Sequence, residues 1–207
     1  GREMSFFRNV SIAVIAAFAF GSAMAADIKL PDYQTVTLDN GATVLLMPRK
    51  DVPLIAANIA VRGGALADAP GKEGTADLLG EMLSKGAGSR TALQFAQAVD
   101  GAGGSLGFGS SREAIVANAQ FLSKDSALML SLLADALLRP TMDAAEFDKL
   151  RKRAIDGIAN AKDSDPRQLI GTYTGGWLFR GHPYGRSTGG DETSLATVAL
   201  ADLQAYR

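Results

Sequence analysis

Two acidic side chains lie four residues apart in the segment GTADLLGEMLSKG, residues 74–86. Its apolar spacing predicts an amphipathic helix, and residues four apart share one helix face, so Asp77 and Glu81 are expected side by side. Carboxylates are hard ligands that could hold calcium or magnesium, but two of them supply few of the oxygens that such ions require. The alternative is a polar surface on which Glu81 pairs with Lys85. Gly80 lies between the two acids, where glycine costs about 1 kcal/mol relative to alanine.

The residue counts exclude several classes of catalytic centre. The chain has no cysteine, which excludes disulfides, thiol catalysis and thiolate metal sites within it. It has one histidine, His182, which excludes any centre within the chain that needs two imidazoles. Because Pro183 follows it, His182 is predicted to lie in a loop with a structural hydrogen bond. A triad that joins His182 to Ser110 or Ser111 is the weaker alternative.

Charge and glycine content argue against nucleic-acid and phosphate ligands. Lys and Arg number 21, Asp and Glu number 22, and the formal net charge is −1. The basic run KLRKR at 149–153 is followed by acids and is predicted to be the solvated face of a helix. The glycine-rich segment 101–111 lacks the Lys-Ser/Thr pair of a phosphate loop and precedes a strand rather than a helix. Its glycines are expected to allow a tight turn and a close backbone approach.

Hydrophobic periodicity predicts the elements that must position these residues. Asn40-Gly41 between two alternating runs predicts a β-hairpin, and 54–64 predicts a third strand. The alternating segment 105–122 predicts two short strands or one bent strand. Helices are predicted at about 75–85, 91–104, 124–139, 143–163, 165–181 and 200–207. The expected fold class is α+β, with a mixed, largely antiparallel sheet and helices packed on one of its faces.

Local signals define several helix ends. Thr91 is a candidate N-cap, and Asp143 with Glu146 has the spacing of a capping box. Trp177 and Phe179, at the end of an amphipathic segment, are expected in the core.

The order and spacing of these segments resembles the insulinase family, which includes pitrilysin and mitochondrial processing peptidase. The resemblance begins at TVTLDNGATVLLMP and continues through VRGGALADAPGKEGTADLLGEML and SSREAIVANAQFL. It ends with DPRQL, HPYGRSTGG and LADLQAYR. It implies that residues 26–207 are the first of two tandem family domains, truncated at the C-terminal end where the pattern would continue into another strand.

In active members, the helix that resembles GTADLLGEML carries an inverted zinc motif, H-x-x-E-H, and a distal glutamate on another helix completes the ligand set. Matched residue by residue, the first histidine falls on Asp77, the general base on Gly80 and the second histidine on Glu81. The distal glutamate falls on Gly157, with Asp156 adjacent if the match shifts by one. All four positions depart from the active pattern, so neither a metal nor a catalytic residue is expected in this chain.

The N-terminus has the pattern of a secretory signal peptide over residues 1–25, including a remnant before Met4. Arg8 supplies a basic start, an apolar run extends over 10–20, and small residues end at Ala25. The run is too short for a membrane span of about 20 residues, and no cysteine follows it that could carry a lipid. A periplasmic or secreted protein without a stable membrane anchor is expected.

The resemblance implies a non-catalytic subunit that binds peptide or supports an active zinc-peptidase homologue in a heterodimer. Zinc is then expected in the partner and no cofactor in this chain. One alternative is a stand-alone peptide-binding or structural module without an enzyme partner. A weaker alternative is a hydrolase that uses other residues.

The resemblance also implies a binding edge, because family members hold substrate as a strand added to a sheet beside the zinc helix. The matching segment consists of Ser105, Leu106, Gly107, Phe108, Gly109 and Ser110. Gly107 and Gly109 would let another backbone approach closely, and proline at Gly109 is predicted to remove an amide donor from this edge. Arg153, one turn before Gly157, is expected to approach Asp77 or Glu81, because two carboxylates need a neighbouring cation.

Overall fold

The computed structural model describes residues 31–207, and the predicted signal peptide at 1–25 lies outside the described residues. The described chain falls into two compact units that divide after Asp51. In the first unit, β1 (Gln34–Thr37) and β2 (Thr43–Leu46) form the antiparallel hairpin that Asn40-Gly41 predicted. The Asn40 side-chain oxygen accepts from the Ala42 amide at 3.0 Å, and Gly41 has a φ of +82°.

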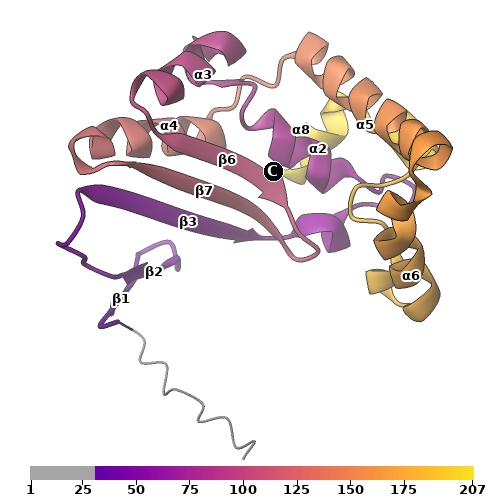
Figure 1. Cartoon of the computed structure of the whole chain (residues 1–207), viewed down its shortest axis with the longest axis horizontal. Coiled ribbons are helices and arrows are strands. Elements are labelled where there is room, and N and C mark those ends of the chain that lie inside the picture. Colours follow the sequence, from indigo (N-terminus) through magenta and orange to yellow (C-terminus); the bar gives the residue numbers. More distant parts are fainter. Residues whose placement is uncertain (1–30) are drawn as a thin grey trace, which may run out of the picture. The chain divides into compact units, whose positions relative to one another are not determined.

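The second unit is built on a three-stranded antiparallel sheet in the order β3-β7-β6 (Figure 1). These strands are β3 (Leu54–Arg62), β6 (Ser105–Ser110) and β7 (Ala114–Leu122). The alternating segment 105–122 therefore forms two strands joined by a tight connection. Every strand pairing in the described part of the chain is antiparallel, in agreement with the prediction of a largely antiparallel sheet.

Helices cover one face of this sheet, which confirms the expected α+β architecture. Alternate residues of β7 are buried (Ala117, Ala119 and Phe121) and pack with α3 (Ala92–Gly101) and α4 (Ser126–Leu138). The intervening β7 residues Asn118 and Gln120 are exposed on the opposite face. Thr91 caps α3 as predicted, in a capping box with Gln94.

A second apolar core lies beside the sheet and fixes the position of α2 (Thr75–Met82). Its buried members include Leu78, Met82, Leu150, Leu195 and Leu203. They come from α2, α5 (Ala144–Ser164), α7 (Glu192–Thr197) and α8 (Leu200–Tyr206). Figure 1 shows α2 between the sheet and α5. The short helix α7 was not predicted from the sequence, since its six residues hold too little periodicity.

Short elements complete the second unit. The 3-10 turns are η1 (Gly64–Ala67), η2 (Ser123–Asp125), η3 (Pro166–Leu169) and η4 (Pro183–Gly185), and β4 (Gly86–Ala87) pairs with β5 (Arg90–Thr91). At the start of α5, Asp143 accepts from the Glu146 amide at 2.9 Å, but the Glu146 carboxylate binds Lys149, so only half of the predicted capping box forms. Within residues 31–207, no helix has the length and apolar character needed to cross a bilayer.

Helix α6 (Ile170–Leu178) contradicts one core prediction. Trp177 is 69% exposed and Phe179 is 43% exposed. The residues of α6 that face neighbouring segments are small: Gly175 lies near Arg112, and Gly176 lies near the backbone of Gly185. The large side chains project from the remaining surface of the helix, because its glycine side is the side that packs.

Candidate functional site

Helix α2 presents Asp77 toward the end of β6. Asp77 is half-buried, and the Ser110 hydroxyl donates to its Oδ1 at 3.0 Å. Burial raises the pKa of the Asp77 carboxyl above its ordinary value, and the Ser110 hydrogen bond partly counteracts that rise. No ion pair joins Glu81 to Lys85 in the described structure, because α2 ends at Met82; the predicted pair is wrong.

Gly80 brings the backbone of α2 close to the backbone of β6. It is buried, and a Cβ atom added there would lie 2.7 Å from the carbonyl carbon and 2.9 Å from the Cα of Gly109. Real Cβ atoms do not approach backbone so closely. The glycine between the two acids is therefore required by packing: it lets the helix backbone rest on the strand backbone. At Gly109, α2 itself makes the close approach that the sequence had suggested for a bound peptide.

The fourth matched position, Gly157, lies in an open setting on α5. A Cβ added there would meet no atom within 4 Å. Arg153, one turn earlier, is exposed and forms no ion pair with Asp77, Glu81 or any other acid among residues 31–207. The structure therefore shows no ion pair between Arg153 and the α2 carboxylates, and a looser approach of Arg153 to them stays a prediction.

A buried carboxylate that sequence reasoning missed fixes the start of α2. Asp68 is 3% exposed and accepts from the amides of Gly74 at 2.8 Å and Ala76 at 2.9 Å. Burial raises the pKa of the Asp68 carboxyl, while these two amides lower it. The Ser194 hydroxyl donates to the carbonyl of Glu73 at 3.0 Å and ties the same turn to α7. Asp68 lies six residues before Gly74 and eight before Ala76, which is outside the spacing of an N-cap. No local sequence pattern therefore identifies it.

β6 lies at an edge of the three-stranded sheet, as predicted, and its residues alternate in the direction of their backbone groups. The Ser111 amide donates to the Ala114 carbonyl at 2.7 Å, which places odd-numbered residues of β6 on the hydrogen-bonded side toward β7. The amides of Leu106, Phe108 and Ser110 therefore face the open edge. Proline at Gly109 would break a bond to β7 rather than remove a donor from the edge, so the predicted effect of that substitution is corrected.

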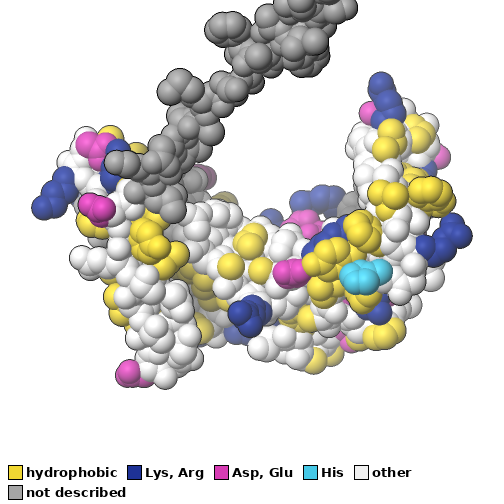
Figure 2. Space-filling view, turned by 90° about the horizontal axis from the view of Figure 1, so that it is seen from below, with side chains coloured by type: hydrophobic (Ala, Val, Ile, Leu, Met, Phe, Trp, Pro, Cys, Tyr) yellow, Lys and Arg dark blue, Asp and Glu magenta, His cyan; other side chains and the backbone are white. Residues whose placement is uncertain are grey.

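The loop after β6 is locked to the loop that carries the single histidine. Arg112 donates to the carbonyls of Tyr184 at 2.5 Å and Arg186 at 3.3 Å, and its guanidinium lies 5.5 Å from the Tyr184 ring centroid. His182 Nδ1 accepts from the Tyr184 amide at 3.1 Å, which confirms its predicted structural role. Figure 2 shows His182 at the surface among apolar and basic side chains.

The residues at the four matched positions do not fit a zinc ion. Glycine occupies two of them, Gly80 and Gly157. Residues 31–207 contain no group of three or more His, Cys, Asp or Glu side chains that could hold a metal. Asp77 is held by Ser110.

Comparison with known proteins now identifies the family. Residues 44–192 match the family described as Insulinase (Peptidase family M16), so the chain belongs to that family, as the sequence resemblance predicted. It is 26% identical over 200 residues to the mitochondrial-processing peptidase subunit beta of Blastocladiella emersonii, covering 96% of this chain and 42% of that protein. It is 31% identical over 133 residues to an uncharacterised zinc protease of Mycobacterium bovis, covering 64% of this chain and 30% of that protein. The chain thus spans less than half the length of these relatives.

Solved structures show the same fold. A peptidase M16 inactive domain from Pseudomonas fluorescens superposes with a TM-score of 0.79 at 26% identity, covering 84% of this chain and 42% of that one. Pitrilysin gives a TM-score of 0.69 at 22% identity, covering 87% of this chain and 19% of that one, and shows the fold alone.

Proposed function

We propose that this chain is a non-catalytic insulinase-family module that binds extended peptide along β6. The contact between Gly80 and Gly109 carries the proposal, because it fills the place of the general base with backbone while leaving the β6 edge open. A positioned general base contributes about 10²–10⁴ in rate. A module without that base and without a ligand set can still bind the chain that an active enzyme would cut.

Strand addition is the binding mode that survives the loss of catalytic side chains. It depends on main-chain hydrogen bonds, and Leu106, Phe108 and Ser110 direct their backbone groups to the open edge. Ser110 also donates to Asp77, so the far end of this edge is fixed to α2. A peptide aligned with β6 would therefore meet a rigid template.

Partner and location follow from the same proposal. The Blastocladiella relative is named as a subunit of a processing peptidase, which supports assembly of this module with an active zinc-peptidase homologue. The sequence pattern of residues 1–25 supports export to the periplasm. Zinc would then be bound by the partner.

Fluorescence polarisation with defined peptides tests the proposal. The probe is a fluorescein-labelled decapeptide of alternating valine and threonine, and two matched versions are N-methylated at alternate residues, one on each edge of the strand. Methylation of the edge that faces β6 is expected to abolish binding, whereas methylation of the other edge leaves it unchanged, because only the first removes donors to β6.

The same mixtures are followed by mass spectrometry with added zinc. Intact peptide after prolonged incubation is the expected result. Chelator-sensitive cleavage would overturn the non-catalytic assignment, and equal binding of both methylated peptides would overturn strand addition.

A further inference from the structure

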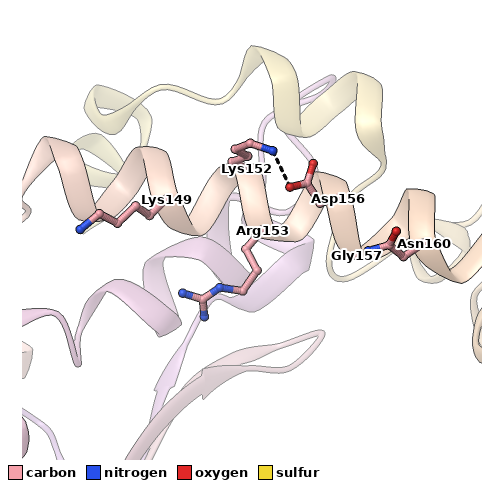
Figure 3. Close-up of a pocket in the computed structure, with 6 residues that line it drawn as sticks. All are labelled: Lys149, Lys152, Arg153, Asp156, Gly157 and Asn160. Carbon is pink, nitrogen blue, oxygen red and sulfur yellow. Dashed lines mark hydrogen bonds and ion pairs between the residues drawn. The ribbon is translucent and has the colours of Figure 1, made fainter.

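Three residues on one side of α5 line a shallow hollow. Arg153, Gly157 and Asn160 occupy positions i, i+4 and i+7, which share one helix face. Together with Lys149, Lys152 and Asp156 they line a space of about 430 Å³ (Figure 3). The rise of the helix places Arg153 and Asn160 about 10 Å apart along its axis.

Two of the three cations around this hollow are already neutralised. Lys149 Nζ lies 2.8 Å from Glu146 Oε1, and Lys152 Nζ lies 2.6 Å from Asp156 Oδ2. Arg153 has neither an ion pair nor a hydrogen bond with any residue that the structure describes. Its planar guanidinium offers donors in a fork that matches a carboxylate. The hollow therefore holds one positive charge that its own lining leaves unanswered.

Space for a ligand lies directly beside that charge. Gly157 has no side chain, and no atom lies within 4 Å of the place where its Cβ would be. In Figure 3 the Arg153 side chain extends away from the Lys152–Asp156 pair, toward the side where the strands lie. No side chain therefore occupies the space directly over Gly157.

Helix α2 contacts both β6 and α5, the helix that carries the hollow. α2 rests on β6 through Gly80 and Gly109, and its apolar side chains share a core with Ile155 and Ile158 of α5. A peptide extends about 3.3 Å per residue, so a few residues beyond the strand-like segment are enough to pass α2.

We propose that Arg153 and the open face at Gly157 bind a carboxylate of the peptide that adds to β6. This inference rests on the proposed function and specifies its substrate class: extended peptides with a terminal carboxylate or an acidic side chain beyond the added strand. Arg153 provides the positive charge that holds the carboxylate by a forked pair of hydrogen bonds. Asn160 lies at the other end of the same hollow. The two carboxylate sources have the same chemistry and are separated by experiment.

Three versions of the valine–threonine decapeptide separate these sources: a free C-terminal acid, a C-terminal amide, and an amide with one internal glutamate. The free acid is expected to bind the native chain about tenfold more tightly than the amide, because a hydrogen bond to a charged group is strong. Recovery of that affinity by the glutamate peptide would assign the side chain as a sufficient source. Failure of the glutamate peptide to recover it would assign the terminal carboxylate.

Arg153→Gln tests the residue, and Arg167→Gln is the matched control, since Arg167 carries the same charge outside the hollow and pairs with Asp165. Arg153→Gln is expected to bind acid and amide equally, at the affinity of the amide for the native chain, while Arg167→Gln keeps the tenfold preference. A preference that persists in Arg153→Gln, or no preference in the native chain, would overturn the carboxylate site and leave β6 binding intact. Absence of binding by all three peptides would overturn the proposed function and this site with it.

Discussion

Helices α2 and α6 are nearly equal in length but differ in how their side chains are used. Six of the eight residues of α2 are buried, and its one glycine contacts a strand backbone. None of the nine residues of α6 is buried, and Tyr173 and Trp177 are 60% and 69% exposed. An amphipathic pattern therefore shows that a helix has an apolar face, but the neighbouring elements decide whether that face is covered.

The position of glycine explains the difference between the two helices. In α2, Gly80 packs on Gly109 while leucines on the flanking positions enter the core. In α6, Gly175 and Gly176 form the packed side, so the large residues face outward. Stability is therefore expected to fall when buried residues of α2 are changed, and to change little when the exposed large side chains of α6 are truncated.

The largest expected contrast is between Leu79→Ala and Trp177→Ala. Leu79 is 3% exposed, and its truncation is expected to lower the free energy of unfolding by about 2–5 kcal/mol. Trp177→Ala removes more atoms but is expected to change it by less than about 0.5 kcal/mol, because the side chain is exposed. Urea denaturation of both variants provides the measurement, and similar losses in the two would contradict the contrast.

A second contrast uses the glycines of the same helices. Gly80→Ala is expected to destabilise the chain by about 1–3 kcal/mol, because the new methyl group collides with the Gly109 backbone. Gly171→Ala in α6 meets no atom within 4 Å and is expected to stabilise by about 0.5–1 kcal/mol through helix propensity. Thermal unfolding followed by circular dichroism compares them; a stable Gly80→Ala variant would show that α2 does not rest on β6.

The smallest effect concerns the partly buried carboxylate of α2. Because burial raises the pKa of Asp77 in the folded chain, the folded state holds this proton more tightly than the unfolded state. The Asp77 contribution to stability therefore falls as pH rises from the ordinary value of about 3.9 through the raised pKa. Asp77→Asn keeps an oxygen that can accept from Ser110 and removes the charge.

At pH 7 this variant is expected to be more stable by less than about 1 kcal/mol, since Asp77 is partly exposed and screened. The gain should vanish near pH 3. Asp100→Asn, an exposed change of the same type on α3, serves as control. Urea titrations at several pH values decide the matter: a loss of stability in Asp77→Asn at pH 7 would show that the ionised carboxylate is favoured by its surroundings.

Most of the fold could be predicted from local pattern. Asn40-Gly41 identified the first hairpin, alternation identified β3, β6 and β7, and Thr91 identified the start of α3. These features depend on residues close together in the chain. The core prediction for Trp177 failed because it depends on which side of α6 meets the rest of the molecule, and that is decided by contacts with Arg112 and Gly185.

The site could be predicted in part. The sequence placed Asp77, Gly80 and Glu81 on one helix and Gly157 on another, and it placed β6 at a sheet edge. It did not reveal that Gly80 touches Gly109, since that contact joins residues 29 positions apart through three-dimensional packing. It also did not show which amides of β6 face outward, because that depends on the pairing register with β7.

The contact of Gly80 with Gly109 limits the order in which catalytic residues could be introduced. A glutamate can enter at Gly157, because no atom lies within 4 Å of the place where its Cβ would be. A glutamate at position 80 requires a shift of α2 or β6, because even its Cβ would collide with the backbone of Gly109. Directed evolution by single steps would therefore stall at this position, and a library aimed at catalysis must vary α2 and β6 together.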